Sequence, residues 1–278
     1  MYLIDYHVHS DVSEDCKSSM RAMAEAEAAA GVRVMCFTNH CDLFRWEDDL
    51  PKPRCRDIAR ESAEKLALLR AETGTPPLEI RLGLELGEGH RDPELAALLA
   101  GDERLDFVLG SLHLLPGYGD FYWQHYTTHA QCEQMFDLYL DELQQIAELD
   151  YYDVIAHFGY GRRYMLRDGV DAAMTLERFG GKIERVLRTV IDKGRGIELN
   201  CSGLTDASGP FPSEEILLLY RSLGGETVTL GSDAHSPAQA AHGLAEGLAL
   251  LRRCGFDRVA LFRERKAEYL KIETLMEG

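Results

Sequence analysis

Residues 3–9 read LIDYHVH, a short apolar run that ends in two histidines placed two positions apart. The apolar part predicts a β-strand over residues 3–6. In an extended segment the side chains of residues i and i+2 point the same way, so the imidazoles of His7 and His9 can bind one metal ion. A hydrogen-bonded histidine pair fits the same sequence, and the rest of the chain decides between the two interpretations.

The rest of the chain alternates short apolar segments with longer amphipathic ones. We predict strands over 3–6, 32–37, 78–86, 107–112, 154–156, 196–199 and 227–230, with a further strand-like piece over 259–262. We predict helices over 18–30, 57–72, 93–100, 131–149, 176–193, 213–223 and 237–254. This alternation indicates an α/β domain in which a parallel sheet is covered by helices, with one domain over 1–278. An open doubly wound sheet and a closed barrel both fit, although no glycine-rich phosphate motif follows the first strand.

Each of the seven predicted strands that alternate with helices delivers a polar side chain at or just after its end. In chain order these side chains are His7 and His9, His40, Glu85, His113, His157, Asn200, and Asp233 with His235. The carboxyl ends of parallel strands lie at the same end of a β/α fold, and active sites are built there. Scattered surface histidines would not follow strand ends, so the pattern predicts a shared metal centre.

The number of candidate ligands predicts more than one metal ion. A single zinc ion takes three or four protein ligands, and the strand ends supply more than that. Asp15, on the loop after the first strand, is either a further ligand or a solvated charge. Imidazole and carboxylate ligands without thiolates suit Zn, Mn or Fe. We therefore expect a cluster of two or three divalent ions, in which Glu85 can bridge two of them.

Composition excludes several classes of partner. The chain of 278 residues has 30 Lys and Arg against 47 Asp and Glu, a formal net charge of −17. Proteins that coat nucleic acid or bind anionic membranes need excess positive charge, so neither partner is expected. The seven cysteines form no C-x-x-C pair, and the sequence contains neither a signal-peptide pattern nor an apolar membrane segment. A reduced, cytoplasmic location is expected.

The ordered motifs resemble those of the PHP (polymerase and histidinol phosphatase) family. They are His7-x-His9, Thr38-Asn39-His40, Gly83-Leu84-Glu85, Gly110-Ser111-Leu112-His113, Ala156-His157 and Gly231-Ser232-Asp233-Ala234-His235. The resemblance implies a distorted seven-stranded TIM-like barrel with three metal ions. It assigns one ion to His7, His9, Glu85 and Asp233, a second to Glu85, His113 and His157, and a third to Asp15, His40 and His235.

Within this family the chain looks most like the stand-alone histidinol-phosphatase branch, because of its length, the IELN run at residues 197–200 and an arginine pair after His157. The resemblance implies a metal-dependent phosphomonoesterase that hydrolyses L-histidinol phosphate, in histidine biosynthesis. A hydroxide between two ions would attack phosphorus. Asp233 or His235 would protonate the leaving oxygen, and Arg162 or Arg163 would bind the phosphate.

Other functions fit parts of the same pattern. The substrate could be another small phosphate ester, such as a nucleotide, a sugar phosphate or a phosphotyrosine peptide. Asn39 and Gly159 stand where relatives often carry acidic residues, which bears on the substrate class. An amidohydrolase-like metal hydrolase also uses a β/α barrel with His-x-His, but usually with a lysine at a strand end, and no predicted strand here ends in lysine. The third alternative is a metal-binding module without catalysis. The sequence predicts no oligomeric state.

Overall fold

Seven parallel strands form the centre of the molecule. The computed structural model describes residues 2–72, 74 and 76–277. The strands are β1 (Leu3–Val8), β2 (Val32–His40), β3 (Glu79–Gly87), β4 (Phe107–Ser111), β7 (Val154–Ile155), β8 (Gly196–Asn200) and β9 (Val228–Gly231), and they pair in this order. The amide of Asp233 donates to the carbonyl of His7 at 2.8 Å, and the amide of His9 to that of Ala234 at 3.0 Å. These two bonds link the first strand to the segment after the last, so the sheet is a nearly closed barrel, as expected.

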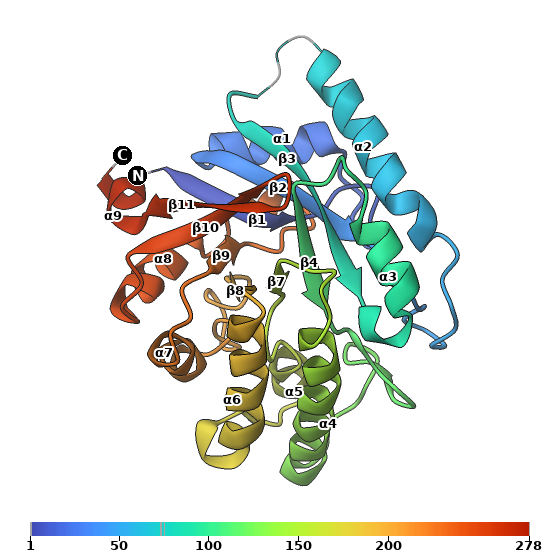
Figure 1. Ribbon diagram of the computed structural model, residues 1–278, viewed down its shortest axis with the longest axis vertical. Coiled ribbons are helices and arrows are strands. Elements are labelled where there is room, and N and C mark those ends of the chain that lie inside the picture. Colours follow the sequence, from blue (N-terminus) through green and yellow to red (C-terminus); the bar gives the residue numbers. More distant parts are fainter. Residues whose placement is uncertain (1, 73, 75, 278) are drawn as a thin grey trace.

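Helices cover the outside of this barrel (Figure 1). They are α1 (Met20–Ala29), α2 (Cys55–Ala71), α3 (Pro93–Ala100), α4 (His129–Ala147), α6 (Leu176–Asp192), α7 (Glu214–Ser222) and α8 (Leu244–Arg253). α6 shows why such segments form surface helices, because its buried side chains recur at helical spacing and its other face is polar. These buried side chains are Phe179, Ile183, Val186, Leu187 and Val190.

The predicted helix over 237–254 is wrong, because the chain turns between two shorter helices. A 3-10 turn, η2 (Pro237–Gln239), precedes α8, and the residues between them include Ala241 and Gly243 in the left-handed region, at φ 56° and 69°. Left-handed backbone cannot continue a right-handed α-helix. A short helix, α5 (Arg162–Arg167), was not predicted at all, and it begins with the arginine pair.

A C-terminal hairpin closes the amino end of the barrel. The predicted strand at 259–262 is β10 (Arg258–Arg263), which pairs antiparallel with the unpredicted, largely exposed β11 (Lys266–Lys271). Arg81, near the start of β3, donates to the carbonyl of Phe262 at 2.7 Å. Arg265, in the hairpin turn, donates to Asp153 at 2.6 Å, just before β7. The short helix α9 (Ile272–Glu277) follows. The opposite, carboxyl end of the barrel is therefore where a site can open.

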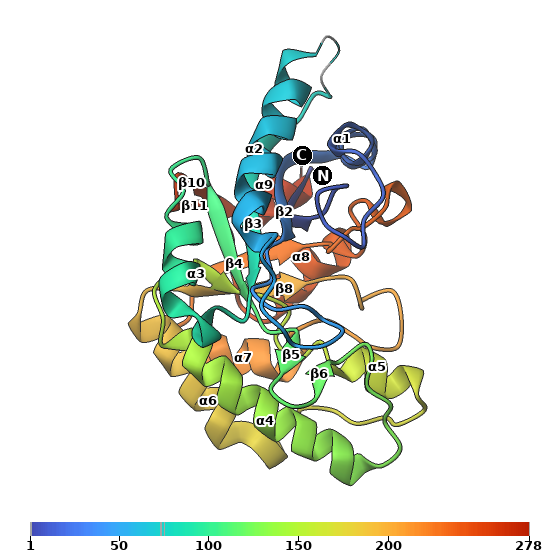
Figure 2. The ribbon, with the colours of Figure 1, turned by 90° about the vertical axis from the view of Figure 1, so that its right-hand side faces the viewer.

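Three short elements complete the fold: η1 (Gly89–Arg91), β5 (Leu114–Leu115) and β6 (Gly119–Asp120). β5 and β6 pair with each other inside the long loop that follows β4. Figure 2 shows β5, β6 and α5 on the same side of the molecule. A search of the described residues finds no helix with the length and hydropathy of a transmembrane segment.

Glu27 provides a test of the packing of α1 against the barrel. Its side chain is buried, and its Oε1 accepts a hydrogen bond from the amide of Ala241 at 3.3 Å. Burial, and then the negative charge of Asp5, raise the pKa of Glu27 from 4.5 to about 9. The folded protein thus holds this proton more tightly than the unfolded chain, and the resulting stability, complete below pH 4.5, is lost as the pH rises through about 9.

We expect Glu27→Gln to raise the melting temperature at pH 8, by roughly 4 °C, and to leave it nearly unchanged at pH 4.5. Glutamine keeps the oxygen that accepts from Ala241 but has no proton to lose. Thermal unfolding at the two pH values measures the effect. An equal change at both pH values would show that ionisation of Glu27 does not contribute to stability.

Candidate metal centre

The carboxyl ends of the barrel strands bring the predicted ligands together. His7 lies in β1, His40 is the last residue of β2, and Glu85 lies near the end of β3. The remaining predicted ligands lie one to four residues after a strand end, except Asp15, which comes from the loop after β1. Four groups of three side chains have their ligand atoms within 4.8 Å of one another. They are His7, His9 and Glu85; Glu85, His113 and His157; His9, His40 and His235; and His40, Asp42 and His113.

The first group surrounds one oxygen of the central glutamate. His7 Nε2 lies 3.1 Å and His9 Nε2 3.5 Å from Glu85 Oε2. Asp233 Oδ1 lies 3.5 Å from His7 Nε2 and 3.3 Å from His9 Nε2. Two imidazole nitrogens and two carboxylate oxygens therefore converge here, which is a donor set that Zn, Mn and Fe accept.

The second group surrounds the other oxygen of the same glutamate. His157 Nε2 lies 2.7 Å and His113 Nε2 3.1 Å from Glu85 Oε1. The two imidazole nitrogens lie 3.3 Å from each other. Because Glu85 turns a different oxygen to each group, its carboxylate can bridge two ions.

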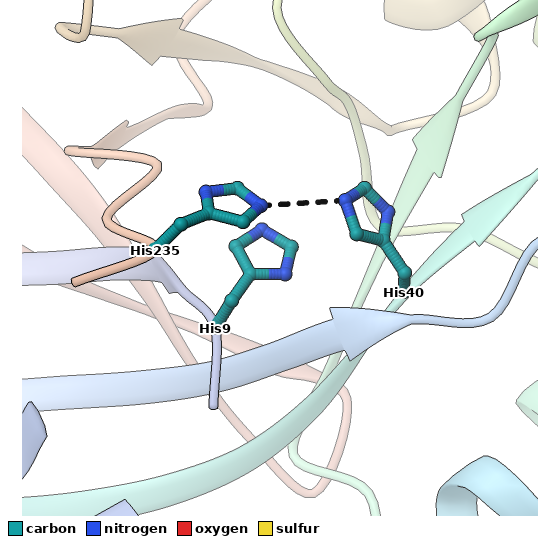
Figure 3. A group of neighbouring side chains, drawn as sticks. All are labelled: His9, His40 and His235. Carbon is teal, nitrogen blue, oxygen red and sulfur yellow. Dashed lines mark hydrogen bonds between the residues drawn. The ribbon is translucent and has the colours of Figure 1, made fainter. Parts of the chain in front are cut away.

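The third group lies nearer the solvent. Two of its histidines, His9 and His235, follow the first and the last strand of the barrel (Figure 3). His235 Nε2 lies 3.5 Å from His40 Nε2 and 3.1 Å from Asp15 Oδ2. His40 Nε2 lies 3.5 Å from the same carboxylate oxygen. The His9 ring stacks on the His235 ring with centroids 3.9 Å apart, which connects this group to the first. Asp15 thus faces two imidazoles instead of standing free as a loop charge.

Three side chains that the sequence did not predict as part of the centre orient its imidazoles. His7 Nδ1 lies 2.7 Å from Glu198, His9 Nδ1 3.0 Å from Ser13 Oγ, and His113 Nδ1 2.8 Å from Asp42. Each contact holds the ring so that Nε2 points into the centre, as is usual for metal-binding histidines. Asp42 also belongs to one of the four groups, so its carboxylate can itself serve as a ligand.

The chemistry of the centre fits metal ions. Among the described residues, His7 Nε2, His9 Nε2, His40 Nδ1 and Glu85 Oε2 are buried atoms without a hydrogen-bond partner. Burial and the neighbouring imidazoles of His235 and His40 lower the pKa of His9 to about 3, so its ring is neutral and keeps a free lone pair. Buried polar atoms without partners are costly, and a cation bound by the first group would satisfy three of them: His7 Nε2, His9 Nε2 and Glu85 Oε2.

The central carboxylate is held in its charged form. Burial alone would raise the pKa of Glu85, but the imidazoles of His40, His7 and His113 outweigh this and hold the pKa well below its usual value. Asp233 behaves in the same way, since His7 and the contact with His9 at 3.3 Å overcome the effect of burial on its pKa. Both carboxylates are thus ready to bind a cation.

Two of the candidate ligands have left-handed backbones. His157 has φ 24° and Asp233 has φ 59°. Side chains other than glycine rarely adopt this conformation, and such strain persists where the surrounding structure imposes it, often at functional sites. Here the amide of His157 is fixed by Glu198 at 2.7 Å, and Asn200 Nδ2 donates to Asp233 Oδ2 at 3.2 Å.

Replacing Glu198 by glutamine tests the role of this orienting carboxylate. We expect metal affinity to fall about 10- to 100-fold, because the neutral amide no longer holds the ring N–H of His7 with a full charge. Competition with a chelator measures the affinity. Glu142→Gln is the matched control, since Glu142 pairs with His90 at 2.7 Å and belongs to none of the four groups. Equal affinities for both variants would contradict the orienting role.

A cavity of about 720 Å³ opens over the centre. This volume lies within the usual range for small-molecule sites, roughly 300–1,000 Å³. Arg163 lines the cavity with its guanidinium also in contact with Ser202. Arg162 instead lines a separate cavity of about 110 Å³, where it donates to the carbonyl of Ser208 at 2.7 Å and to Asp171 at 2.8 Å. Of the arginine pair, the structure therefore brings only Arg163 to the centre.

Asn39 and Gly159, which stand where relatives often carry acidic residues, both make hydrogen bonds within the fold. Asn39 Oδ1 accepts from the amide of Ser10 at 2.8 Å, and its Nδ2 donates to Ser62 at 3.0 Å, which ties the loop after β1 to α2. Gly159 has φ 87° and its amide donates to the hydroxyl of Tyr139 at 3.1 Å. An aspartate at this position would be strained. Neither residue belongs to one of the four ligand groups.

The sequence also matches a known protein family. The family model of the PHP domain matches residues 5–202, which is more than half of the chain. The chain belongs to the PHP family. This assignment confirms the resemblance seen in the motifs.

Individual relatives cover nearly the whole length of this PHP protein. Histidinol-phosphatase of Lactococcus lactis subsp. lactis is 25% identical over 276 residues, or 96% of this chain and 97% of that protein. The probable histidinol-phosphatase of Clostridium acetobutylicum is 27% identical over 273 residues, or 96% and 99%.

Solved structures show the same fold. Histidinol phosphate phosphatase from Lactococcus lactis subsp. lactis, in complex with zinc, L-histidinol and phosphate, has a TM-score of 0.78 at 24% identity, covering 96% of this chain and 98% of that one. The putative histidinol phosphatase from Listeria monocytogenes has a TM-score of 0.70 at 15% identity, covering 87% and 99%.

Proposed function

We propose that this PHP protein is a metal-dependent phosphomonoesterase that hydrolyses L-histidinol phosphate to L-histidinol and phosphate. The observation that carries the proposal is the clustering of the candidate ligands around Glu85 and Asp233 at a cavity lined by Arg163. Such a site combines metal ligands with a guanidinium suited to phosphate. The names of the relatives, and the L-histidinol and phosphate bound to the Lactococcus lactis protein, support this substrate.

We further propose that the centre holds three divalent ions, with zinc favoured by the Lactococcus lactis complex. The donors would be the three sets assigned above: His7, His9, Glu85 and Asp233; Glu85, His113 and His157; and Asp15, His40 and His235. Bound there, divalent ions supply Lewis-acid activation of water and of the phosphate oxygens. They also provide the local positive charge that lets a protein of net charge −17 bind an anion.

The chain's own residues then divide the remaining tasks. Arg163 presents its guanidinium to the cavity and binds the phosphate, since a planar guanidinium can donate two hydrogen bonds to phosphate oxygens. Asp233 and His235 both line the cavity beside the ligand groups. Because Asp233 is held in its charged form, His235, whose pKa is raised despite burial by Asp15, is the residue that can deliver a proton to the leaving oxygen. Asn200 keeps Asp233 in place through the bond to Oδ2. The partner is thus a small phosphorylated molecule, and residues 1–278 act as one domain.

A substrate panel separates this function from its alternatives. Protein loaded with Zn or Mn, and metal-stripped protein, would be assayed against phosphomonoesters, including L-histidinol phosphate, a nucleotide, a sugar phosphate and phosphotyrosine, and against cyclic amides. We expect metal-dependent release of phosphate and no amide hydrolysis. Amide hydrolysis would favour the amidohydrolase alternative. Metal binding without turnover of any compound would favour a non-catalytic module.

A further inference from the structure

Asp120 is a buried carboxylate that faces the cavity without a cationic partner. It is the second residue of β6, is 9% exposed and lines the cavity. Its Oδ1 accepts a hydrogen bond from the amide of Tyr122 at 2.5 Å. Over residues 2–72, 74 and 76–277, no lysine, arginine or histidine nitrogen lies within the 4.0 Å of an ion pair with this carboxylate. A cationic ligand can neutralise a buried carboxylate that has no ion-pair partner.

The cavity wall around this carboxylate is aromatic. Trp46, Tyr122, Trp123, Tyr160 and Tyr164 line the same cavity. The rings of Tyr122 and Tyr160 each meet that of Tyr164 edge-on, with centroids 5.7 and 5.8 Å apart. The faces of aromatic rings attract cations, so a cavity lined by these rings and by a carboxylate without an ion-pair partner is an environment for a positively charged group.

Asp120 is held close to the backbone of His113, so a substrate that reaches both the metal groups and Asp120 can be short. Asp120 pairs across the β5–β6 ribbon with Leu114, the residue directly after His113. The next residue, Phe121, donates its amide to the carbonyl of His113 at 3.4 Å. The cavity therefore has a phosphate-binding end, with the metal groups and Arg163, and a negatively charged wall adjacent to it.

Outside the candidate ligand sets, neither Glu198 nor Asp206 can fill this role. Glu198 is 1% exposed, does not line the cavity, and is bound to His7 Nδ1 and to the amide of His157, both at 2.7 Å. Asp206 does line the cavity, but it is exposed, and its Oδ1 accepts from the amide of Ser208 at 2.7 Å. An exposed carboxylate is screened by solvent and binds a cation weakly.

We infer that Asp120, within its aromatic surround, binds an ammonium group carried by the alcohol part of the substrate. This inference rests on the proposed function and narrows it: the preferred phosphomonoester carries its phosphate and a primary ammonium on the same short chain, as L-histidinol phosphate does. Asp120 is then a specificity-determining residue that selects amino-alcohol phosphates over phosphate esters of uncharged alcohols.

Asp120→Asn is the variant that tests this role, because asparagine keeps the oxygen that accepts from Tyr122 and removes only the charge. Two substrates would be compared: L-histidinol phosphate, and the analogue in which hydrogen replaces the amino group. We expect kcat/KM for the amino ester to fall about 10- to 100-fold, mainly through KM, because a charged hydrogen bond is lost. The amine-free ester should change by less than about 2-fold, since it makes no contact that the charge strengthens.

Asp102→Asn is the matched control and should change neither substrate, because Asp102 also accepts from the amide two residues on, that of Arg104 at 3.0 Å, but does not line the cavity. An equal loss for both esters in Asp120→Asn would reduce Asp120 to a structural role, and no loss for either would also overturn the inference. Calorimetric binding of L-histidinol itself to metal-loaded wild type and Asp120→Asn separates the two proposals. If the wild type hydrolyses no ester but binds L-histidinol through Asp120, the proposed function fails and the ammonium site stands. If hydrolysis occurs and Asp120→Asn binds L-histidinol with the affinity of the wild type, the proposed function stands and the ammonium site fails.

Discussion

Replacing Glu85 by glutamine is expected to remove metal binding and phosphatase activity together. Its carboxylate lies 3.1 Å from His7 Nε2, 3.0 Å from His40 Nδ1 and 2.7 Å from His157 Nε2, and it belongs to two of the four ligand groups. A neutral amide cannot bridge two cations through two anionic oxygens. We expect kcat/KM to fall by at least about 1,000-fold, because the metal supplies the main stabilisation of the phosphoryl transition state.

Metal content by mass spectrometry and phosphate release, measured on the same preparations, test this expectation. Glu88→Gln is the matched control, because Glu88 is equally buried but turns its Oε1 to the amides of His113 and Leu114, at 2.7 and 3.0 Å. Burial, and then the charge of Asp42, raise the pKa of Glu88 to about 8, so glutamine resembles its protonated form. A Glu85→Gln protein that keeps its full metal content and activity would contradict the assignment of the centre.

Replacing Arg163 by alanine has the second largest expected effect. Its guanidinium lines the cavity and stacks over Phe211 with 5.2 Å to the ring centroid. A rigid guanidinium placed beside the metal groups can donate two hydrogen bonds to a phosphate and neutralise part of its charge. We expect kcat/KM for a phosphomonoester to fall about 100- to 1,000-fold, with a clear rise in KM, as for the loss of other preorganised donors.

The neighbouring arginine is the control for this experiment. Arg162→Ala removes the same group, but Arg162 holds the carbonyl of Ser208 and the carboxylate of Asp171 outside the cavity. We expect its kinetic effect to stay below about 3-fold, with any change confined to thermal stability. Steady-state kinetics on both variants test this expectation. A larger loss of kcat/KM in Arg162→Ala than in Arg163→Ala would show that Arg163 does not bind the phosphate.

That the candidate ligands lie together could be predicted from sequence because parallel strands have a common carboxyl end. His40 and Glu85 are placed by the strand pairing itself, since His40 stands opposite Glu85 in the register of β2 and β3. Once seven strands were expected, their last residues had to meet at one end of the barrel. The orienting side chains were harder to assign. Ser13 and Asp42 reach the centre from loops, and the path of a loop does not follow from periodicity.

The directions of the side chains in the arginine pair and in the loop after His113 could not be predicted from sequence either. Arg162 and Arg163 begin an unpredicted helix, α5, and point in different directions because helical residues are about 100° apart. In the loop after His113, Tyr122 and Trp123 line the cavity and are 51% and 57% exposed, while Phe121 is buried. The residue types of this loop do not tell which rings face a cavity, and the structure divides them between the cavity wall and packing on the barrel.

We propose that bound metal ions and the residues around Glu85 hydrolyse a phosphomonoester. The most direct test is titration of metal-stripped protein with Zn²⁺ while the release of phosphate from L-histidinol phosphate is followed. Turnover should be absent at first, rise with each added equivalent, and level off when about three equivalents are bound. Turnover that is unaffected by stripping, or absent from protein that has bound its full metal content, would contradict the account.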